Sequence, residues 1–313
     1  MSSLGPVTTE NWGRPPHNRW SFQHVQELFP TCRLARDPSA AFVLPTKPQD
    51  IMQLTFEAAD GTSTSIREFL AAACCDAFLV VHNGRVIAEH YFNGMTVRSH
   101  HLLNSVTKSF VGMLAGIAVD RDQLEPSSLI TRYLPELDSA AWQGTTIRHL
   151  LDMTAAAQYT EDYADPETDF WKESAVVGRR PALASDKTPR TLLDYARSLD
   201  GQDMEDGSRF QYRTVCANVI GMVLERAMGA RLATLLETEI WSRLAAQHDA
   251  TIVVDSLGFP YVGAGMNACA RDLANFGLMM INDGAFIGIH GQYVYMDKGR
   301  DFVIVMLSSQ PQP

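Results

Sequence analysis

Ser105 and Lys108, within NSVTKSFVGMLAG at residues 104–116, have the residue types and the spacing of a nucleophile and its base. The apolar residues around them recur with helical spacing, and positions i and i+3 share a helix face, so the two side chains can meet on the first turn. The pair alone is a weak motif, because 20 serines and five lysines give about 0.3 such pairs by chance. Ser105 could instead cap the helix, with Lys108 a solvated side chain.

The proposed chemistry sets a condition on the lysine. A serine hydroxyl is a poor nucleophile until a positioned base removes its proton. The ordinary pKa of lysine is about 10.4, so lowering it by roughly 3 units costs about 4 kcal/mol, which burial and a helix N-terminus could supply. We therefore expect Lys108 to be withdrawn from solvent and to point at Ser105.

The composition excludes several classes of partner. The chain has 313 residues, 46% hydrophobic and 20% charged, with a formal net charge of −10. The acidic balance argues against nucleic acid or an anionic membrane as partner. No stretch approaches the roughly 20 apolar residues of a membrane span, and no basic and apolar leader opens the chain, so we expect a cytoplasmic location. The five cysteines match no zinc spacing, and we expect neither metal nor other cofactor.

Strand patterns lie near both ends of the chain, with helical patterns between them. Two β-rich runs flank Asn83-Gly84, a dipeptide typical of two-residue hairpin turns, and two more cover residues 288–297 and 301–309. Residues 1–20, rich in Pro, Gly and Asn, are expected to form an extended surface arm. Helices are expected at 105–119, 145–156, 191–199, 214–229, 231–244 and 267–281, with Gly229 ending the fourth.

This order of elements predicts an α/β protein whose antiparallel sheet is built from both chain ends, with flanking helices and an inserted all-helical lobe. We expect residues 1–313 to form a single catalytic domain of two lobes. Residues 21–104 and 255–313 would form the α/β lobe, and residues 105–254 the mainly helical lobe.

Several motifs resemble one known family. NSVTKSFVGMLAGI, ITRYLPEL, TTIRHLLDMTAA, FQYRTVCANVIGMVLERAMG and GAGMNACARDLANFGLMM occur in the order and at the spacings of the serine β-lactamase-like hydrolases, which share the penicillin-binding-protein fold. HNRWSFQHV, HLLNSVTKS, YTEDYADP, FQYRTV and GIHGQ resemble the branch of 6-aminohexanoate-dimer hydrolases, which degrade nylon oligomers, and their carboxylesterase relatives. The resemblance covers residues 10 to 309.

The resemblance implies a role for each matching residue. Ser105 would be the acylated nucleophile, Lys108 its base, and Tyr212 the residue that relays a proton to the leaving group. Gly288 matches the glycine of the family's Lys-Thr-Gly-like strand, so the N–H groups of Ile289 and Ser105 would form the oxyanion hole.

Other residues fit either a substrate contact or a structural role. Tyr163 matches a substrate-contacting tyrosine of the nylon-oligomer branch. His290, beside the oxyanion donor, could touch the site or simply pack in a strand. Acidic residues in 161–169 could hold a substrate ammonium, although such clusters are more often solvated loops. Gly112 and Gly116 are expected to permit close helix packing in the core.

Three departures from the family pattern bear on the substrate. Thr214 stands where the family's Tyr-x-Asn element has asparagine, and Phe286-Ile287-Gly288 lacks the usual lysine or histidine before the glycine. A β-lactam would lose an amide and a cationic partner, which disfavours β-lactamase activity. Only NDGAF separates the last predicted helix from the strand, where the family has several dozen residues lining the cleft.

The sequence thus predicts a serine hydrolase that cleaves linear amides of the 6-aminohexanoate-dimer type, or carboxyl esters, through an acyl-enzyme on Ser105. Its partner would be a small-molecule amide or ester, and a homodimer is left open. The alternatives are a short-chain carboxylesterase with little amidase activity and a degenerate, non-catalytic binding protein. An exposed Lys108, or Tyr212 far from Ser105, would favour the last.

Overall fold

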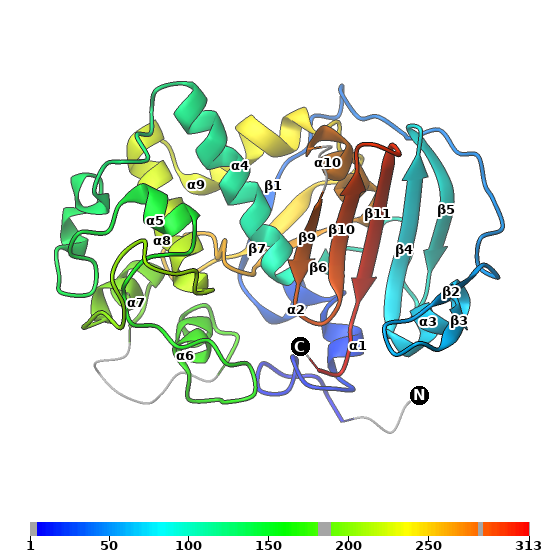
Figure 1. Cartoon of the computed structure of the whole chain (residues 1–313), viewed down its shortest axis with the longest axis horizontal. Helices are drawn as coiled ribbons and strands as arrows, with labels where there is room; N and C mark the ends of the chain where they lie inside the picture. Colours follow the sequence, from blue (N-terminus) through cyan, green and yellow to red (C-terminus); the bar gives the residue numbers. More distant parts are fainter. Residues whose placement is uncertain (1–4, 181–188, 281–283, 313) are drawn as a thin grey trace.

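A five-stranded antiparallel sheet is the main β structure of the computed structural model, which describes residues 5–180, 189–280 and 284–312. Its strand order is β5-β4-β11-β10-β9, with β4 at Cys75–His82, β5 at Arg85–Tyr91, β9 at Gly284–Gly288, β10 at Gln292–Asp297 and β11 at Phe302–Ser308. The central strands β4 and β11 come from opposite ends of the sequence and pair directly. The predicted sheet built from both chain ends is confirmed (Figure 1).

The hairpin between β4 and β5 follows from its turn residues. Asn83 and Gly84 have φ of 50° and 65°, which is the left-handed region that a two-residue turn of this kind requires. His82 pairs with Arg85 across the turn.

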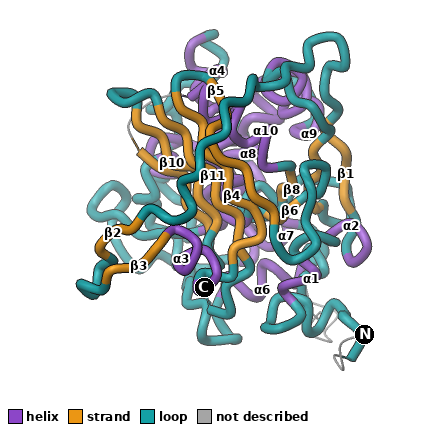
Figure 2. The backbone as a smooth tube through the Cα atoms, turned by 90° about the vertical axis from the view of Figure 1, so that its right-hand side faces the viewer, coloured by secondary structure: helices purple, strands orange, loops and turns teal. Residues whose placement is uncertain are grey.

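The described part of the chain also forms a smaller, four-stranded sheet. Its order is β1-β7-β8-β6, with β1 at Thr31–Leu34, β7 at Ala250–Val253, β8 at Met266–Ala268 and β6 at His101–Leu102. Strand β7 lies at the end of the range 105–254, which the sequence predicts to be mainly helical. A third pair, β2 at Thr55–Glu57 and β3 at Ser63–Ser65, lies with helix α3 at the side of the main sheet (Figure 2).

Helix α4 lies between the main sheet and a group of helices (Figure 1). On the sheet side, α10 packs against β4, β10 and β11. No helix in the described part of the chain is long and apolar enough to cross a membrane. The helices are α1 at Asn18–Ser21, α2 at Val25–Leu28, α3 at Ile66–Ala72, α4 at Thr107–Asp120, α5 at Ile147–Leu151, α6 at Asp169–Val176, α7 at Leu192–Ser198, α8 at Thr214–Met228, α9 at Leu232–Leu235 and α10 at Ala270–Met280.

Some predicted elements differ from those observed. The helix predicted at 145–156 is only the short α5, and the one predicted at 231–244 is α9 followed by a π turn, η4 at Leu236–Ile240, and a 3₁₀ turn, η5 at Trp241–Arg243. Residues 5–20 do not form an extended arm. They make successive turns, and Trp12 is buried against Phe29 and beneath the guanidinium of Arg179.

Candidate active site

Ser105 and Lys108 meet as their spacing predicts. Ser105 lies in the 3₁₀ turn η1 at Asn104–Val106, which leads directly into α4. The Lys108 Nζ lies 3.0 Å from the Ser105 Oγ, and both residues are half-buried. The ring of Tyr212 lies 4.9 Å from the same Nζ. The two observations that would have favoured a non-catalytic protein, an exposed Lys108 and a distant Tyr212, are not found.

The amine of Lys108 has three oxygen neighbours. Besides Ser105, it is bonded to the Thr214 Oγ1 at 3.1 Å and the Gly263 carbonyl at 2.7 Å. An ammonium can donate to all three oxygens. A neutral amine can donate to two of them and accept the Ser105 hydroxyl proton on its lone pair. The same arrangement therefore accommodates the lysine before and after proton transfer.

Thr214 connects Lys108 to a carboxylate. Its hydroxyl donates to the Glu161 Oε1 at 2.7 Å, and its N–H donates to the Glu161 Oε2 at 2.7 Å. Thr214 is the first residue of α8, whose N-cap residue Arg213 makes no side-chain cap. Glu161 thus caps α8 from a distant loop, where a negative charge is favoured by the helix dipole.

A second carboxylate reaches Lys108 through Gly263. The Gly263 N–H donates to the Asn218 Oδ1, and the Asn218 Nδ2 donates to the Glu173 Oε1 at 2.8 Å. Burial raises the pKa of Glu173 to about 7, although hydrogen bonds from Tyr159 and Asn218 oppose the shift. A Cβ on Gly263 would lie 2.4 Å from the Thr214 Cγ2, so only glycine fits between the two networks.

The turn that carries the nucleophile is fixed against the end of β9. Asn104 has φ of 45°, a conformation that asparagine tolerates, and its Nδ2 donates to the Ile289 carbonyl at 3.0 Å. A Cβ on Gly288 would lie 3.1 Å from the Ser105 N and 2.7 Å from the Leu103 carbonyl. The predicted oxyanion residues, Ser105 and Ile289, are therefore held on adjoining backbone segments.

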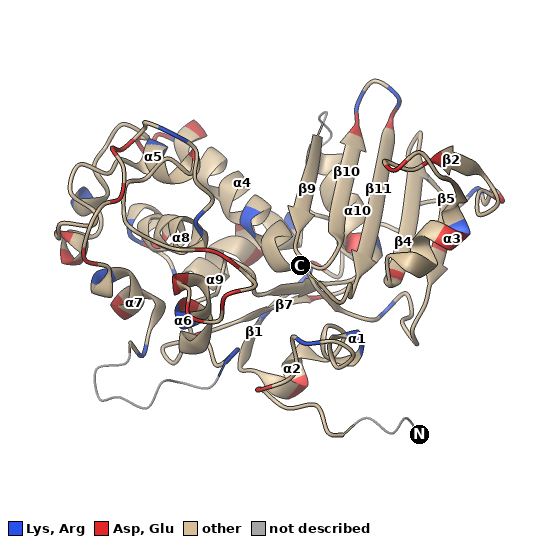
Figure 3. Cartoon of the chain, turned by 60° about the horizontal axis from the view of Figure 1, so that its bottom comes forward, with Lys and Arg blue, Asp and Glu red and all other residues tan. Residues whose placement is uncertain are grey.

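A cavity of about 290 Å³ opens at Ser105, Lys108 and Tyr212. Apart from Ser109, its other lining residues are apolar or glycine, and they come from α4, α5, the segment after α5, α8 and β9: Val111, Gly112, Leu150, Leu151, Met153, Ala217, Ile220, Ala285, Phe286 and Ile287. Figure 3 shows that β9 carries no Lys, Arg, Asp or Glu. The cavity suits an uncharged, apolar substrate segment next to the nucleophile.

The remaining predicted contacts lie around the cavity. The Tyr163 hydroxyl donates to the Glu161 Oε1 at 2.8 Å and its ring packs edge-on against Phe170, so this tyrosine supports the carboxylate network. His290 is buried, has φ of 63° and packs edge-on against Phe22. Its Nδ1 lies 2.8 Å from the Gln310 carbonyl, and burial lowers its pKa. Of its two predicted roles, the structure favours packing over substrate contact.

The acidic residues of 161–169 do not form one cation-binding cluster. Asp162 and Asp165 accept from backbone N–H groups two residues further on, and Asp169 accepts from Thr160. The contacts of Asp162 and Asp165 are local turn contacts in a solvated loop, whereas Asp169 is the first residue of α6 and also accepts from the Tyr195 hydroxyl at 3.2 Å. Glu161 is the exception, because it alone of the five bonds to a partner of Lys108.

Sequence reasoning missed the residues that hold Lys108 in place. The sequence pattern at Thr214 shows only that the family's asparagine is absent, and it assigns no role to Glu173 or Asn218. Asn218 is four residues after Thr214, so both lie on one face of α8. That spacing, behind the predicted catalytic tyrosine, was the available signal. The two carboxylates come from segments distant in the sequence, Glu161 from a loop and Glu173 from α6, and no local pattern marks them.

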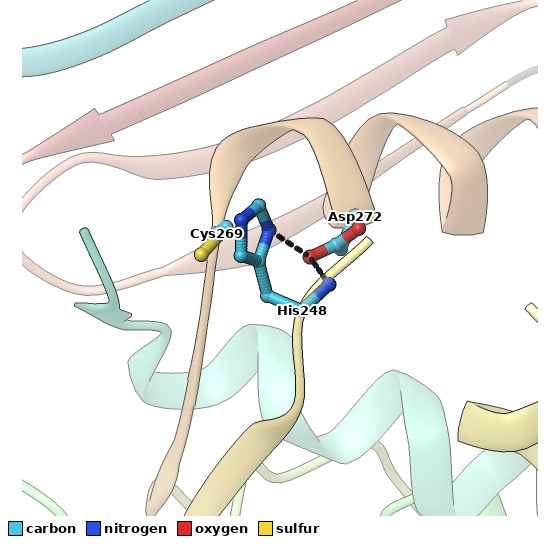
Figure 4. Close-up of side chains that lie close together, drawn as sticks. All are labelled: His248, Cys269 and Asp272. Carbon is cyan, nitrogen blue, oxygen red and sulfur yellow. Dashed lines mark hydrogen bonds and ion pairs between the residues drawn. The ribbon is translucent and has the colours of Figure 1, made fainter. Parts of the chain in front are cut away.

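One cluster of side chains that could ligate a metal ion has a structural role instead. His248, Cys269 and Asp272 place one ligand atom each within 4.8 Å of one another (Figure 4). Asp272 already accepts from the Gln247 N–H at 2.6 Å, the His248 N–H at 3.2 Å and the His248 Nδ1 at 3.3 Å. Burial raises the pKa of the Cys269 thiol, which opposes the thiolate that a metal needs. These contacts fix the segment before β7 to the start of α10.

The comparison with protein families agrees with this geometry. The family model described as Beta-lactamase matches residues 64–286. A 6-aminohexanoate-dimer hydrolase of Paenarthrobacter ureafaciens is 31% identical over 368 aligned positions, which cover 100% of this chain and 90% of the relative. The alignment is longer than this chain, so part of the relative has no counterpart here. A Beta-lactamase of Escherichia coli K12 is 43% identical over 53 residues, 17% of this chain and 14% of that protein.

Solved structures show the same fold. A Bacillus anthracis protein provisionally named a 6-aminohexanoate-dimer hydrolase superposes with a TM-score of 0.93 at 24% identity, covering 100% of this chain and 94% of that one. EstCE1, a hydrolase with promiscuous acyltransferase activity, gives a TM-score of 0.59 at 17% identity over 78% of this chain and 91% of its own. With the family model matching more than half of its residues, the chain belongs to the beta-lactamase family of serine hydrolases.

Proposed function

We propose that the protein hydrolyses linear amides of the 6-aminohexanoate-dimer type, or carboxyl esters, through an acyl-enzyme on Ser105. The observation that carries the proposal is the 3.0 Å contact between the Ser105 Oγ and the Lys108 Nζ at the mouth of an apolar cavity. Geometry comes first in identifying a nucleophile and its base, and this pair meets that criterion.

The reaction would proceed in two steps. Lys108 accepts the hydroxyl proton as the Ser105 Oγ bonds to the substrate carbonyl carbon, and the carbonyl oxygen becomes an anion. The N–H groups of Ser105 and Ile289 would stabilise this anion, by about 3 kcal/mol per donor. The C–N or C–O bond then breaks as the leaving group takes a proton through Tyr212. Water then attacks the acyl carbon and gives a proton to Lys108, the bond from that carbon to the Ser105 Oγ breaks, the carboxylic acid leaves, and Lys108 returns the proton to Ser105.

The apolar lining supports a linear substrate over a β-lactam. At two positions the side chain that would contact a β-lactam is absent. Thr214 replaces the asparagine and is hydrogen-bonded to Lys108 and Glu161. Ile287 replaces the cation before Gly288, and its side chain is 58% exposed. The Paenarthrobacter relative supports an amide substrate. The apolar lining of the cavity accepts an ester as readily as an amide, which makes carboxylesterase activity the second candidate.

Labelling with a fluorophosphonate probe tests the nucleophile. We expect one modified peptide that contains Ser105, and loss of the label in Ser105→Ala with an unchanged circular dichroism spectrum. Ser109→Ala is the matched control, because Ser109 lines the same cavity one turn further along α4 and should leave labelling intact. Label on another serine would refute the mechanism. A folded protein that takes no label would also refute it, and would favour a non-catalytic binding protein.

Turnover of two substrates separates the candidate activities. Hydrolysis of the linear 6-aminohexanoate dimer would support the amidase. Activity on p-nitrophenyl butyrate with none on the dimer would support the esterase instead.

A further inference from the structure

Gly112 and Gly116 lie on the open side of α4, not in its packed face. Both are exposed, and a Cβ built on either would meet no atom within 4 Å. The buried face of α4 is formed by other residues, among them Phe110 and Leu114. The expectation that these glycines permit close helix packing is therefore wrong. Glycine inside a helix is unfavourable relative to alanine, so two of them on an open face leave a bare strip of backbone at a cost in stability.

This bare strip is the floor of a groove that begins at the nucleophile. A second hollow, of about 740 Å³, adjoins the active-site cavity and shares Ser109, Gly112 and Phe286 with it. Gly116 lies in the second hollow. At a rise of 1.5 Å per residue, the path along α4 from Ser105 to Gly116 is about 17 Å long.

Apart from Ser109, the lining of the second hollow is apolar until its far end. Its apolar side chains are Met113, Ile117, Met280 and Phe286. Methionine adapts its shape to an apolar ligand readily.

The charges of the groove gather at that far end and offset one another. Arg121 donates to Glu239 at 2.8 Å, and Arg243 lies 3.2 Å from the same carboxylate. Asp120 adds a second negative charge there. The four charges sum to zero, so the groove provides no net charge to attract an ion.

We infer that this groove binds an unbranched aliphatic chain of the substrate, extending along α4 from the carbonyl held at Ser105. The inference rests on the proposed function and specifies its substrate class. The apolar walls favour methylene groups, and the continuity with the Ser105 cavity makes the substrate itself the occupant. The chain can belong to the acyl part or to the leaving group, and two series of esters distinguish these.

The test compares long and short esters in wild-type and filled-groove variants. One series extends the acyl chain, from p-nitrophenyl acetate to p-nitrophenyl dodecanoate, and the other extends the alcohol, from ethyl acetate to dodecyl acetate. In the wild type we expect kcat/KM to rise along one series, because each buried methylene adds binding energy. In Gly116→Leu we expect the ratio of kcat/KM for the long ester to that for the short one to fall at least about tenfold in that series.

Val119→Leu is the matched control. Val119 is an exposed residue of the same helix that does not line either hollow, and enlarging it should leave the ratio unchanged. Gly116→Ala should raise the melting temperature by about 2 °C, which checks that the site is open.

The outcomes separate this inference from the proposed function. If the wild type hydrolyses acetate esters but Gly116→Leu does not change the ratio in either series, the groove inference is wrong and the hydrolase stands. If the wild type hydrolyses no ester and Ser105 takes no label, the proposed function fails. Equilibrium dialysis with dodecanoate then tests the groove alone. Binding that Gly116→Leu weakens at least about tenfold would support the groove, and equal binding would overturn it.

Discussion

The two walls of the active site are built differently. On the helical side, the amine of Lys108 is held by Ser105, Thr214 and Gly263, and two carboxylates, Glu161 and Glu173, lie behind those contacts. On the sheet side, β9 is an edge strand with no charged residue, and Ile287 is 58% exposed.

The difference separates chemistry from selectivity. Proton transfer needs atoms fixed to a fraction of an ångström, which buried polar networks provide. An apolar wall sets which substrate fits and tolerates change, because apolar contacts are non-directional. Substitutions on the helical side should therefore reduce kcat, and those on the sheet side should alter KM.

Lys108→Met should cause the largest loss. The substitution keeps the stem and removes the base, so we expect kcat to fall by about 10³- to 10⁴-fold. Steady-state kinetics on p-nitrophenyl butyrate checks this, and Lys47→Met, at an exposed position, serves as control. An unchanged kcat would remove Lys108 from the mechanism.

Glu173→Gln should change the pH dependence of stability. The pKa of Glu173 is about 7 in the folded protein against an ordinary 4.5. The folded state therefore holds a proton that the unfolded state releases, and the stability this contributes is present below about pH 4.5 and lost as the pH rises through 7. The loss is about 3 kcal/mol between about pH 4 and pH 8.

Urea unfolding at the two pH values measures this effect. The advantage of Glu173→Gln over the wild type should grow with pH by about 3 kcal/mol, since glutamine cannot ionise. If the two proteins show parallel pH profiles, the Glu173 carboxyl is not the titrating group.

Thr214→Val tests whether the helical side must be fixed to work. Valine has the same shape but lacks the hydroxyl between Lys108 and Glu161, so we expect kcat to fall by about 10- to 100-fold. Thr214→Ser retains the hydroxyl and should recover most of the activity. Equal losses in both variants would indicate that packing matters at this position and the hydroxyl does not.

Ile287→Ser should have the smallest effect. It removes one exposed apolar contact from the sheet wall, so we expect KM for apolar esters to rise about threefold with kcat unchanged. Ile287→Val should behave as the wild type. A fall in kcat as large as that of Thr214→Val would show that the two walls are not functionally distinct.

Local sequence patterns predicted the elements whose shape depends on neighbouring residues. The Asn83-Gly84 turn forms because both residues accept positive φ, and α8 ends at Gly229, with φ of 67°, for the same reason. The spacing of Ser105 and Lys108 fixes their approach through helix geometry alone.

The resemblance to the family predicted the fold and the proximity of Tyr212 to Lys108, which residue spacing alone could not predict. Glu161 and Glu173 reach the site from a loop and from α6, and no local pattern encodes where a distant segment will pack.

The sequence by itself determined the nucleophile helix, the hairpin and the likeness to a family, because each depends on short-range geometry or on motif order. The tertiary structure alone decided which side of α4 is open at Gly112 and Gly116, that Trp12 is buried, and that His290 packs against Phe22. The physical reason is that exposure belongs to the assembled surface: a residue is buried or open according to what other segments cover it.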